Sequence, residues 1–331
     1  MGSDLEAAIT AVLLVNRKRA ANPIQTLLTR IENPTRTLGQ HLDWYCKEIL
    51  PARKLAESTR YNWELALKIF KAELGDDIDI VQVDRQRIAT YLGKCKPRMS
   101  NVYRSYLTTI FQHAVAQGLR NDNPVQQTIK REAHVQRQRL SIEQFKAIRE
   151  KSDPWLQRTM DLALWSLQRR DDLAHLTDDN WKDGILSVRQ RKVERHGTGL
   201  LRIKPGKNLL GAIVVCLNSE ERKRCPYLVH RKHEKTNEAK GRTHHMQVQA
   251  DMISRAFAQA RDSMKEFKEM PAANRPTFHE IRSLGGDQYR KLGWKDDQIQ
   301  DLMGHANENV SAMTKHYLDG HGEHWLEVSA A

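Results

Sequence analysis

Apolar residues recur every three to four positions along most of this 331-residue chain, as they do in amphipathic helices. Between residues 37 and 125 no segment alternates as a strand would. Ser58 is placed as an N-cap, a further helix is expected to start near Asp84, and Gly75 and Gly118 are placed as helix ends. The pattern predicts a small all-helical domain over residues 37–125. Its four expected helices cover residues 38–50, 59–74, 83–92 and 100–116.

Polar stretches flank this helical domain. Residues 126–139 are basic and carry no apolar stripe, which predicts an interdomain linker suited to lie along a phosphate backbone. Residues 4–21 have the pattern of a helix, and residues 22–36 contain two Asn-Pro turns. We therefore expect residues 1–36 to form a coupling helix and a linker. Phosphate contacts are expected at the basic residues near helix ends, namely Lys94, Lys96, Arg98 and Arg104.

The second domain, residues 140–331, mixes two periodicities. Ser141 and Gln144 have the spacing of a capping box, and helices are expected at residues 141–151, 155–165 and 250–264. Residues 184–193 and 200–205 are separated by a turn that contains two glycines, which predicts a β-hairpin. A third strand is expected at residues 212–217, an apolar run. The fold class is therefore mainly α with a small β-sheet.

Charge and composition narrow the function. The formal net charge is +13, which favours nucleic acid as partner ahead of an anionic membrane. No apolar run reaches the roughly 18 residues of a spanning helix, and the first residues lack the pattern of a signal peptide. The four cysteines form no CxxC pair and are expected to be reduced thiols of a cytoplasmic protein.

A histidine-rich segment raises the question of zinc. Residues 225–245 hold one cysteine and four histidines among Lys, Arg and Asn residues. Their spacing matches no standard zinc site, so a solvated basic loop is favoured over a metal site. We expect no metal and no cofactor.

Candidate chemistry is concentrated in residues 277–317. His279 and Arg282 are three residues apart in a run with helical spacing, so they share one face. His305 follows a glycine that would end a helix, and Tyr317 lies on a further short helix. Arginine binds phosphate oxygens, histidine exchanges protons near neutral pH, and a phenol can attack phosphorus.

Each of these residues alone also has an ordinary structural explanation. Arg282 could form an ion pair on a helix surface, and His279 could be a core histidine with its bonds satisfied. Tyr317 is one of eight tyrosines, most of which serve packing or surface roles. The functional interpretation depends on the residues occurring together in one ordered set.

That set, with Arg169 and Lys192 added, resembles the tyrosine recombinases, the phage integrase family. The order is Arg, a Lys on a hairpin, His-x-x-Arg, Gly-His and then Tyr, and the phrase TFHEIRSL at 277–284 is specific. The resemblance covers about residues 37–327. It implies a SAM-like helical core-binding domain and a mixed α/β catalytic domain that close on DNA as a C-shaped clamp.

Two positions depart from the family pattern. The family usually has glycine two residues before its first arginine, where this chain has Leu167, and Arg170 competes with Arg169 for the role. Arg169 is preferred because an acidic residue, Asp172, then follows three positions later.

The family lysine is usually followed by threonine, whereas Val193 follows Lys192. Lys192 still fits the hairpin better than Lys204 or Lys207 does.

The resemblance implies a mechanism without metal or nucleotide. Two arginines hold the non-bridging oxygens, one histidine is the base, a second donates a hydrogen bond, the lysine protonates the 5′ oxygen, and the tyrosine becomes a 3′-phosphotyrosine. Asp172 would orient rather than react. The expected catalytic residues are Arg169, Lys192, His279, Arg282, His305 and Tyr317.

The resemblance also implies partners. These are double-stranded DNA at core recombination sites, a homotetramer on that DNA, and accessory DNA-bending proteins, with no membrane. Residues 325–331 are expected to pack on a neighbouring protomer. The chain is expected to start just after an arm-binding domain, and to integrate or excise a mobile element in the bacterial cytoplasm.

Three other functions compete. A type IB topoisomerase shares the chemistry but would relax supercoils without exchanging strands. A DNA-binding protein without catalysis would need no ordered set of six residues. A metal-dependent nuclease using residues 230–245 would lose activity in a chelator.

Overall fold

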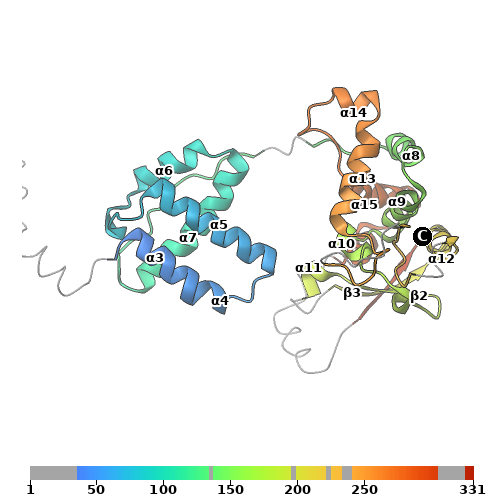
Figure 1. Cartoon of the computed structure of the whole chain (residues 1–331), viewed down its shortest axis with the longest axis horizontal. Helices are drawn as coiled ribbons and strands as arrows, with labels where there is room; N and C mark the ends of the chain where they lie inside the picture. The colour runs from blue at the N-terminus through green and yellow to red at the C-terminus, as the bar shows by residue number, and fades with distance from the viewer. Residues whose placement is uncertain (1–35, 134–136, 195–198, 221–224, 233–240, 305–324) are drawn as a thin grey trace, which may run out of the picture. The chain divides into compact units, whose positions relative to one another are not determined.

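The computed structural model describes residues 36–133, 137–194, 199–220, 225–232, 241–304 and 325–331. The chain divides into two compact units, Met1–Val135 (unit 1) and Gln136–Ala331 (unit 2). The boundary falls inside the linker predicted at 126–139. In the described residues, unit 1 consists of helices and turns, and unit 2 combines helices with one sheet (Figure 1).

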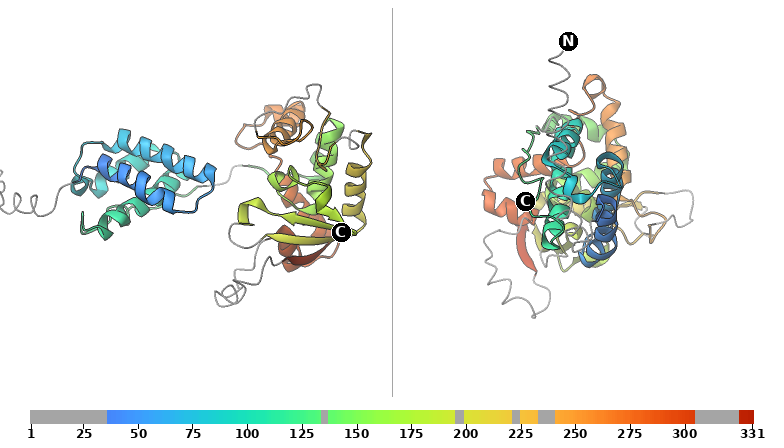
Figure 2. Two further views of the ribbon diagram at one scale, coloured as in Figure 1. Left: turned by 60° about the horizontal axis from the view of Figure 1, so that its bottom comes forward. Right: turned by 90° about the vertical axis from the view of Figure 1, so that its left-hand side faces the viewer.

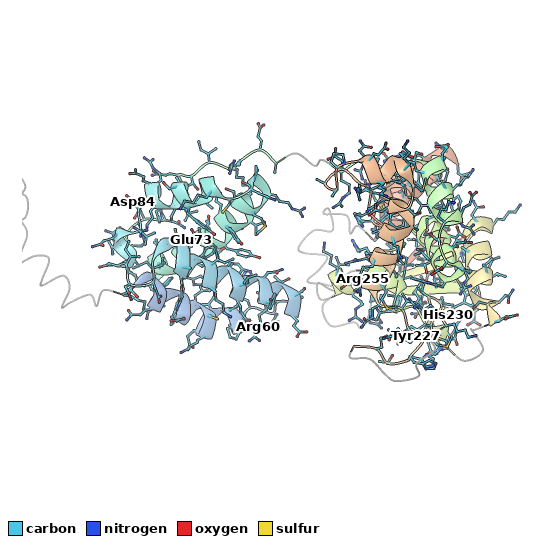
Figure 3. The ribbon with its side chains drawn as sticks, turned by 45° about the horizontal axis from the view of Figure 1, so that its top comes forward. Arg60, Glu73, Asp84, Tyr227, His230 and Arg255 are labelled. Carbon is cyan, nitrogen blue, oxygen red and sulfur yellow. The ribbon has the colours of Figure 1, made fainter. Side chains whose placement is uncertain are left out.

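The four helices predicted for unit 1 are confirmed, with small shifts of their ends. Asp84 caps α6 by accepting a hydrogen bond from the Arg87 amide at 2.8 Å, and Figure 3 labels it. Gly75 ends α5 with a φ of 97°, which glycine adopts freely. The cap predicted at Ser58 is wrong, because the helix begins earlier, after Ala56. The helical segments are α3 (Leu38–Trp44), the π-helix η1 (Tyr45–Ile49), α4 (Leu50–Ala52), α5 (Glu57–Leu74), the 3₁₀ turn η2 (Ile80–Gln82), α6 (Arg85–Lys94) and α7 (Pro97–Ala116).

The core of unit 1 is aromatic and takes in one histidine. Tyr45 stacks on Trp63 with ring centroids 5.6 Å apart, and Trp63 stacks on Tyr106. His41 is completely buried, and its Nε2 donates to the carbonyl of Ile110 at 3.1 Å. Burial lowers the pKa of His41 to about 4, so this histidine is neutral in the folded protein at neutral pH.

The first part of the predicted linker is attached to unit 1. The Arg104 Nε donates to the carbonyl of Thr128 at 3.1 Å, and the amide of Arg131 donates to Asn101 Oδ1 at 2.9 Å. Arg104, expected to contact phosphate, therefore fastens the chain to α7. Lys94, next to the turn between α6 and α7, is exposed.

Unit 2 contains ten helical segments and four strands among its described residues. The sheet has the order β1-β2-β3-β4, antiparallel except for the parallel pair β3–β4. The strands are β1 (Trp181–Lys182), β2 (Ile185–Arg189), β3 (Leu200–Pro205) and β4 (Leu326–Ala330). The helices are α8 (Ile142–Glu150), α9 (Pro154–Ser166), α10 (Arg170–Leu173), the 3₁₀ turn η3 (Asp178–Asn180), α11 (Arg191–Glu194), α12 (Lys207–Leu217), α13 (Ala250–Asp262), α14 (Lys265–Glu269), α15 (Glu280–Lys291) and α16 (Asp296–Met303).

The predicted hairpin is confirmed as β2 and β3, which pair from Leu186–Ile203 to Arg189–Leu200. The strand predicted at 212–217 is wrong, since these residues belong to α12. A short, wholly apolar run does not distinguish a strand from a buried helix by periodicity. The start of α12 is held by the chain end, because the Leu209 amide donates to the carbonyl of Ala331 at 2.7 Å.

The tail pairs with this chain's own sheet, and its packing on a neighbouring protomer stays a prediction. β4 runs parallel to β3 along one edge (Figure 2). Just before it, the Trp325 ring is contacted by the guanidinium groups of Arg189 and Arg202, 5.4 and 5.6 Å from its centroid. At the end, the Ala331 amide donates to the Tyr289 hydroxyl at 3.0 Å.

Helix α9 is central to the core of unit 2 and positions the site. It packs against both α12 and α15. Gly285 of α15 lies so close to α9 that a Cβ there would meet the carbonyl of Leu164 and the side chain of Leu167. This close packing holds the start of α15, which carries Arg282, beside the end of α9, from which the chain continues to Arg169.

Candidate active site

The first arginine is placed by a left-handed turn at the end of α9. Leu167 has φ 55° and ψ 23°, so the chain turns there although the residue is not glycine. The Arg169 side chain is 19% exposed, and its Nη1 donates to Gln190 Oε1 at 3.0 Å. The same nitrogen lies 4.0 Å from Asp172 Oδ2.

Its neighbour Arg170 is oriented differently. Its side chain is 43% exposed, lies 3.4 Å from the carboxylate of Asp251, and donates to the Ser254 hydroxyl. These contacts are with α13, whereas Arg169 lies close enough to Arg282 to affect its pKa. The geometry therefore supports Arg169 over Arg170 as the site arginine.

The second arginine and the histidine are held at the start of α15. His279 immediately precedes the helix, and Arg282 lies in its first turn. Arg282 is buried, and its Nη2 donates to the carbonyl of Met303 at 2.6 Å. Burial and the nearby Arg169 lower the pKa of Arg282 to about 10, while Asp172 opposes the shift.

The guanidinium groups of Arg169 and Arg282 repel each other electrostatically, and an anion bound between them would offset that repulsion. With a pKa of about 10, Arg282 remains protonated at neutral pH, and Asp172 is the acid that faces both arginines. Burial raises the pKa of Asp172, while a hydrogen bond from the Arg191 amide and the charge of Arg169 lower it. A phosphodiester would supply the missing negative charge through bidentate contacts.

His279 is suited to take up a proton. Burial lowers its pKa below the ordinary value, and the charge of Arg282 lowers it further, while Glu280 acts in the other direction. The imidazole is therefore neutral at neutral pH and has a lone pair available. Glu280 is itself held by Arg139, whose Nη1 donates to its carboxylate at 2.9 Å.

Lys192 is the second residue of α11 and lies three residues after Arg189, the last residue of β2, and not on the strand end as predicted. It is exposed. The start of α11 is tied to the site, because the Arg191 amide donates to Asp172 Oδ1 at 3.0 Å. Lys204 lies four residues along β3 from Leu200, about 13 Å from that end of the hairpin. Position therefore favours Lys192.

The remaining two predicted residues, His305 and Tyr317, lie outside the described residues. The chain enters that segment from α16, which ends at Gly304 with a φ of 65° as predicted. It leaves the segment at Trp325, before β4.

Two residues of the site were not found from the sequence. Gln168 and Gln190 are buried, 1% and 0% exposed, and bond to each other and to the chain around the arginines. A signal for Gln190 was present in the alternation of the hairpin. It continues the inward-facing positions Leu186 and Val188 by one more step of two.

The possible zinc segment carries no metal cluster in its described part. No group of three or more His, Cys, Asp or Glu residues able to hold a metal is found among the described residues. Tyr227 and His230, labelled in Figure 3, are joined by a hydrogen bond from the His230 Nδ1 to the Tyr227 carbonyl at 2.8 Å. The His230 Nε2 lies 2.6 Å from the Ser219 hydroxyl, so both ring nitrogens have structural partners.

Among the helices of the described ranges, none is long and apolar enough to cross a membrane.

In the described residues the site brings two arginines, Arg169 and Arg282, together with a neutral histidine, His279, an arrangement suited to binding a phosphodiester. The sequence model of the phage integrase family matches residues 138–324, more than half of the chain, and the chain therefore belongs to this family of site-specific recombinases. Its curated relatives include the integrases of Escherichia phage HK022 and Escherichia phage lambda. Each is 28% identical over 338 residues, covering 99% of this chain and 89% of the relative.

Solved structures agree with this assignment. A lambda integrase dimer bound to a COC′ core site matches with a TM-score of 0.75 and 26% identity, covering 99% of this chain and 91% of that chain. A lambda integrase tetramer bound to a Holliday junction matches with the same score and identity, covering 93% of this chain and 90% of that one. The predicted mainly helical fold with a small sheet is confirmed.

Proposed function

We propose that this recombinase cleaves and rejoins duplex DNA at core sites through a 3′-phosphotyrosine at Tyr317. The pair of half-buried Arg169 and buried Arg282 carries the proposal, because two guanidinium groups close together beside the neutral imidazole of His279 suit an anion. The lambda integrase structures, bound to a core site and to a Holliday junction, support the same substrates for this chain.

The proposed cleavage step is balanced in atoms and charge. The Tyr317 oxygen forms a bond to phosphorus while the bond from phosphorus to the 5′ oxygen breaks. The phenol, with an ordinary pKa of about 10, gives its proton to His279. Lys192 gives a proton to the departing 5′ oxygen. The reverse step, with a 5′ hydroxyl from another strand, rejoins DNA and conserves the bond energy.

Charge stabilisation is assigned to three residues. Arg169 and Arg282 each hold a non-bridging oxygen, and His305 donates a further hydrogen bond. Preorganised donors of this kind are each worth about 3 kcal/mol in the transition state. Asp172 holds Arg169 and the start of α11 in place, since it faces Arg169 and accepts a hydrogen bond from the Arg191 amide. None of these roles needs a metal ion.

We further propose that four protomers assemble on two duplexes in the bacterial cytoplasm, assisted by DNA-bending proteins, to integrate or excise a mobile element. Each chain would close on its core site as a C-shaped clamp formed by residues 37–125 and 140–331. The exposed basic residues at the turn between α6 and α7, Lys94, Lys96 and Arg98, are proposed phosphate contacts.

The test is a nicked duplex carrying a core site, incubated with the protein in EDTA and separated on a denaturing gel. The proposal expects a covalent adduct with the parent and none with Tyr317→Phe. Loss of the parent's adduct in EDTA would indicate a metal-dependent enzyme instead. Relaxation of supercoils without exchange of strands between two substrates would indicate a topoisomerase.

A further inference from the structure

Two buried glutamines form an amide pair at the centre of the site. The Gln190 Nε2 donates to Gln168 Oε1 at 2.7 Å and to the carbonyl of Met303 at 2.8 Å. The Gln168 Nε2 donates to the carbonyls of Ser166 and Leu302, at 2.8 and 2.9 Å. Both side-chain amide groups therefore use two donors each, and together they bond the last two carbonyls of α16.

The same pair contacts both arginines. The Gln190 Oε1 accepts from Arg169 at 3.0 Å, and the carbonyl of Met303 that accepts from Gln190 also accepts from Arg282 at 2.6 Å. Gln190 therefore bonds one arginine directly and shares an acceptor with the other.

Space around Gln190 is tightly limited. A Cβ at Gly304 would fall on its amide group, and a Cβ at Gly199 would lie 2.9 Å from its own Cβ. Its backbone amide also donates to the Gly199 carbonyl at 2.8 Å, across the hairpin. Glycine at positions 199 and 304 therefore leaves the room that the Gln190 side chain occupies.

We propose that Gln190, supported by Gln168, is a positioning residue for strand cleavage. It orients the Arg169 guanidinium toward the phosphate and fixes the end of α16, from which the chain continues to His305. This inference rests on the roles proposed above for Arg169 and Arg282. Because Lys192 follows two residues later, Gln190 also ties the hairpin to the arginine pair.

The neutral amide of Gln190 meets both of these demands. It accepts from a guanidinium and donates to two oxygens at once. A carboxylate would keep the bond to Arg169 but neutralise the charge that the phosphate needs, and it would lack both donors. An apolar side chain would leave the buried Gln168 Oε1 without the donor of Gln190 and remove one of the two donors to the Met303 carbonyl, which is costly.

The experiment compares Gln190→Glu and Gln190→Met with Gln247→Glu, a matched control. Gln247 is a buried glutamine of the same unit that accepts from the Thr243 amide at 2.9 Å and contacts no site arginine. Single-turnover adduct formation and the Kd for core-site DNA are measured for each. Amide hydrogen exchange of residues 299–304 is measured in a Tyr317→Phe background, which needs no cleavage.

The inference expects Gln190→Glu to slow adduct formation by about 100-fold, the effect of losing one preorganised donor, with Kd changed by less than about threefold. Gln190→Met should also speed exchange at the end of α16 by about fivefold, and Gln247→Glu should do neither. Should Gln190→Glu fail to fold, Gln190→Met, which keeps the volume, decides.

Adduct formation within about threefold of the parent for both Gln190 variants would overturn the inference, as would equal losses in binding and cleavage. Unchanged exchange at 299–304 in Gln190→Met would also overturn it. If the parent itself forms no adduct, the proposed function fails, and the exchange measurement still decides the role of Gln190.

Discussion

Leu167 offers a quantitative test of how this chain builds the turn before Arg169. It is fully buried in the core of unit 2, yet it has the left-handed conformation at which the family usually has glycine. A non-glycine residue there costs about 1–2 kcal/mol. Removing a buried leucine side chain to alanine costs about 2–5 kcal/mol, and the last methyl about 0.8 kcal/mol more.

Replacement of Leu167 by glycine therefore relieves less backbone strain than the packing energy it removes. Leu167→Gly should lower the free energy of unfolding of unit 2 by about 2 kcal/mol, although it restores the family residue. Leu167→Ala keeps the backbone strain and loses most of the packing, so it should be no more stable than Leu167→Gly. The packing lost is against Gly285 of α15, on the helix that carries Arg282.

The control is Leu162, buried in the same cluster but in the regular part of α9. In a helix interior, glycine is about 1 kcal/mol less stable than alanine. At position 162 the alanine variant should therefore be more stable than the glycine variant, whereas at position 167 it should not be. Urea unfolding of the full chain, following the transition of unit 2, measures both pairs. A Leu167→Gly protein more stable than the parent, or the same order at both positions, would refute the reasoning.

Three further predictions concern charge. The folded pKa of His41, about 4, lies below its ordinary 6.5, so its contribution is complete above pH 6.5 and lost as pH falls toward 4. Unit 1 should lose about 3 kcal/mol over that window, measured by urea unfolding at several pH values. Adduct formation should rise with pH along a limb whose pKa lies below 6.5, because the pKa of His279 is lowered, and should then be level near neutrality. Arg169→Ala should slow adduct formation by about 100- to 1,000-fold, and Arg170→Ala by less than about fivefold.

Each of these three predictions has a result that would contradict it. Acid stability of unit 1 that is unchanged between pH 6.5 and 4 would contradict the burial of a neutral His41. An acid limb above pH 6.5 would mean that His279 is not the base, or is not held near the arginines. Equal losses at Arg169 and Arg170 would contradict the assignment of the first arginine.

The sequence predicted best those helices whose ends are marked by a capping residue or a terminal glycine. Asp84, Gly75, and Ser141 with Gln144 act where their side chains or backbone freedom predict. Residues 212–217 were mistaken for a strand because a short apolar run has no period to distinguish the two states. The helix that contains this segment, α12, has its first turn bonded to a residue far away in sequence, since the Leu209 amide donates to the Ala331 carbonyl.

The site residues also differ in whether local sequence was enough to find them. His279 and Arg282 could be found because their spacing of three is local and helical. The amide pair could not, because Gln168 finds its partners 22 residues away in Gln190 and 134 residues away in Leu302. The position of Lys192 was shifted because α11 begins at Arg191, directly after Gln190, with its first amide held by Asp172.

The most direct test of the central claim is to identify the atom that carries the DNA. The adduct formed with a nicked core-site duplex is digested with protease and nuclease, and the remaining nucleotide-linked peptide is sequenced by mass spectrometry. The account predicts one modified peptide, with a 3′-phosphate ester on Tyr317 and a free 5′ hydroxyl on the released strand. A link to another residue, or a 5′-phosphate ester with a free 3′ hydroxyl, would contradict it.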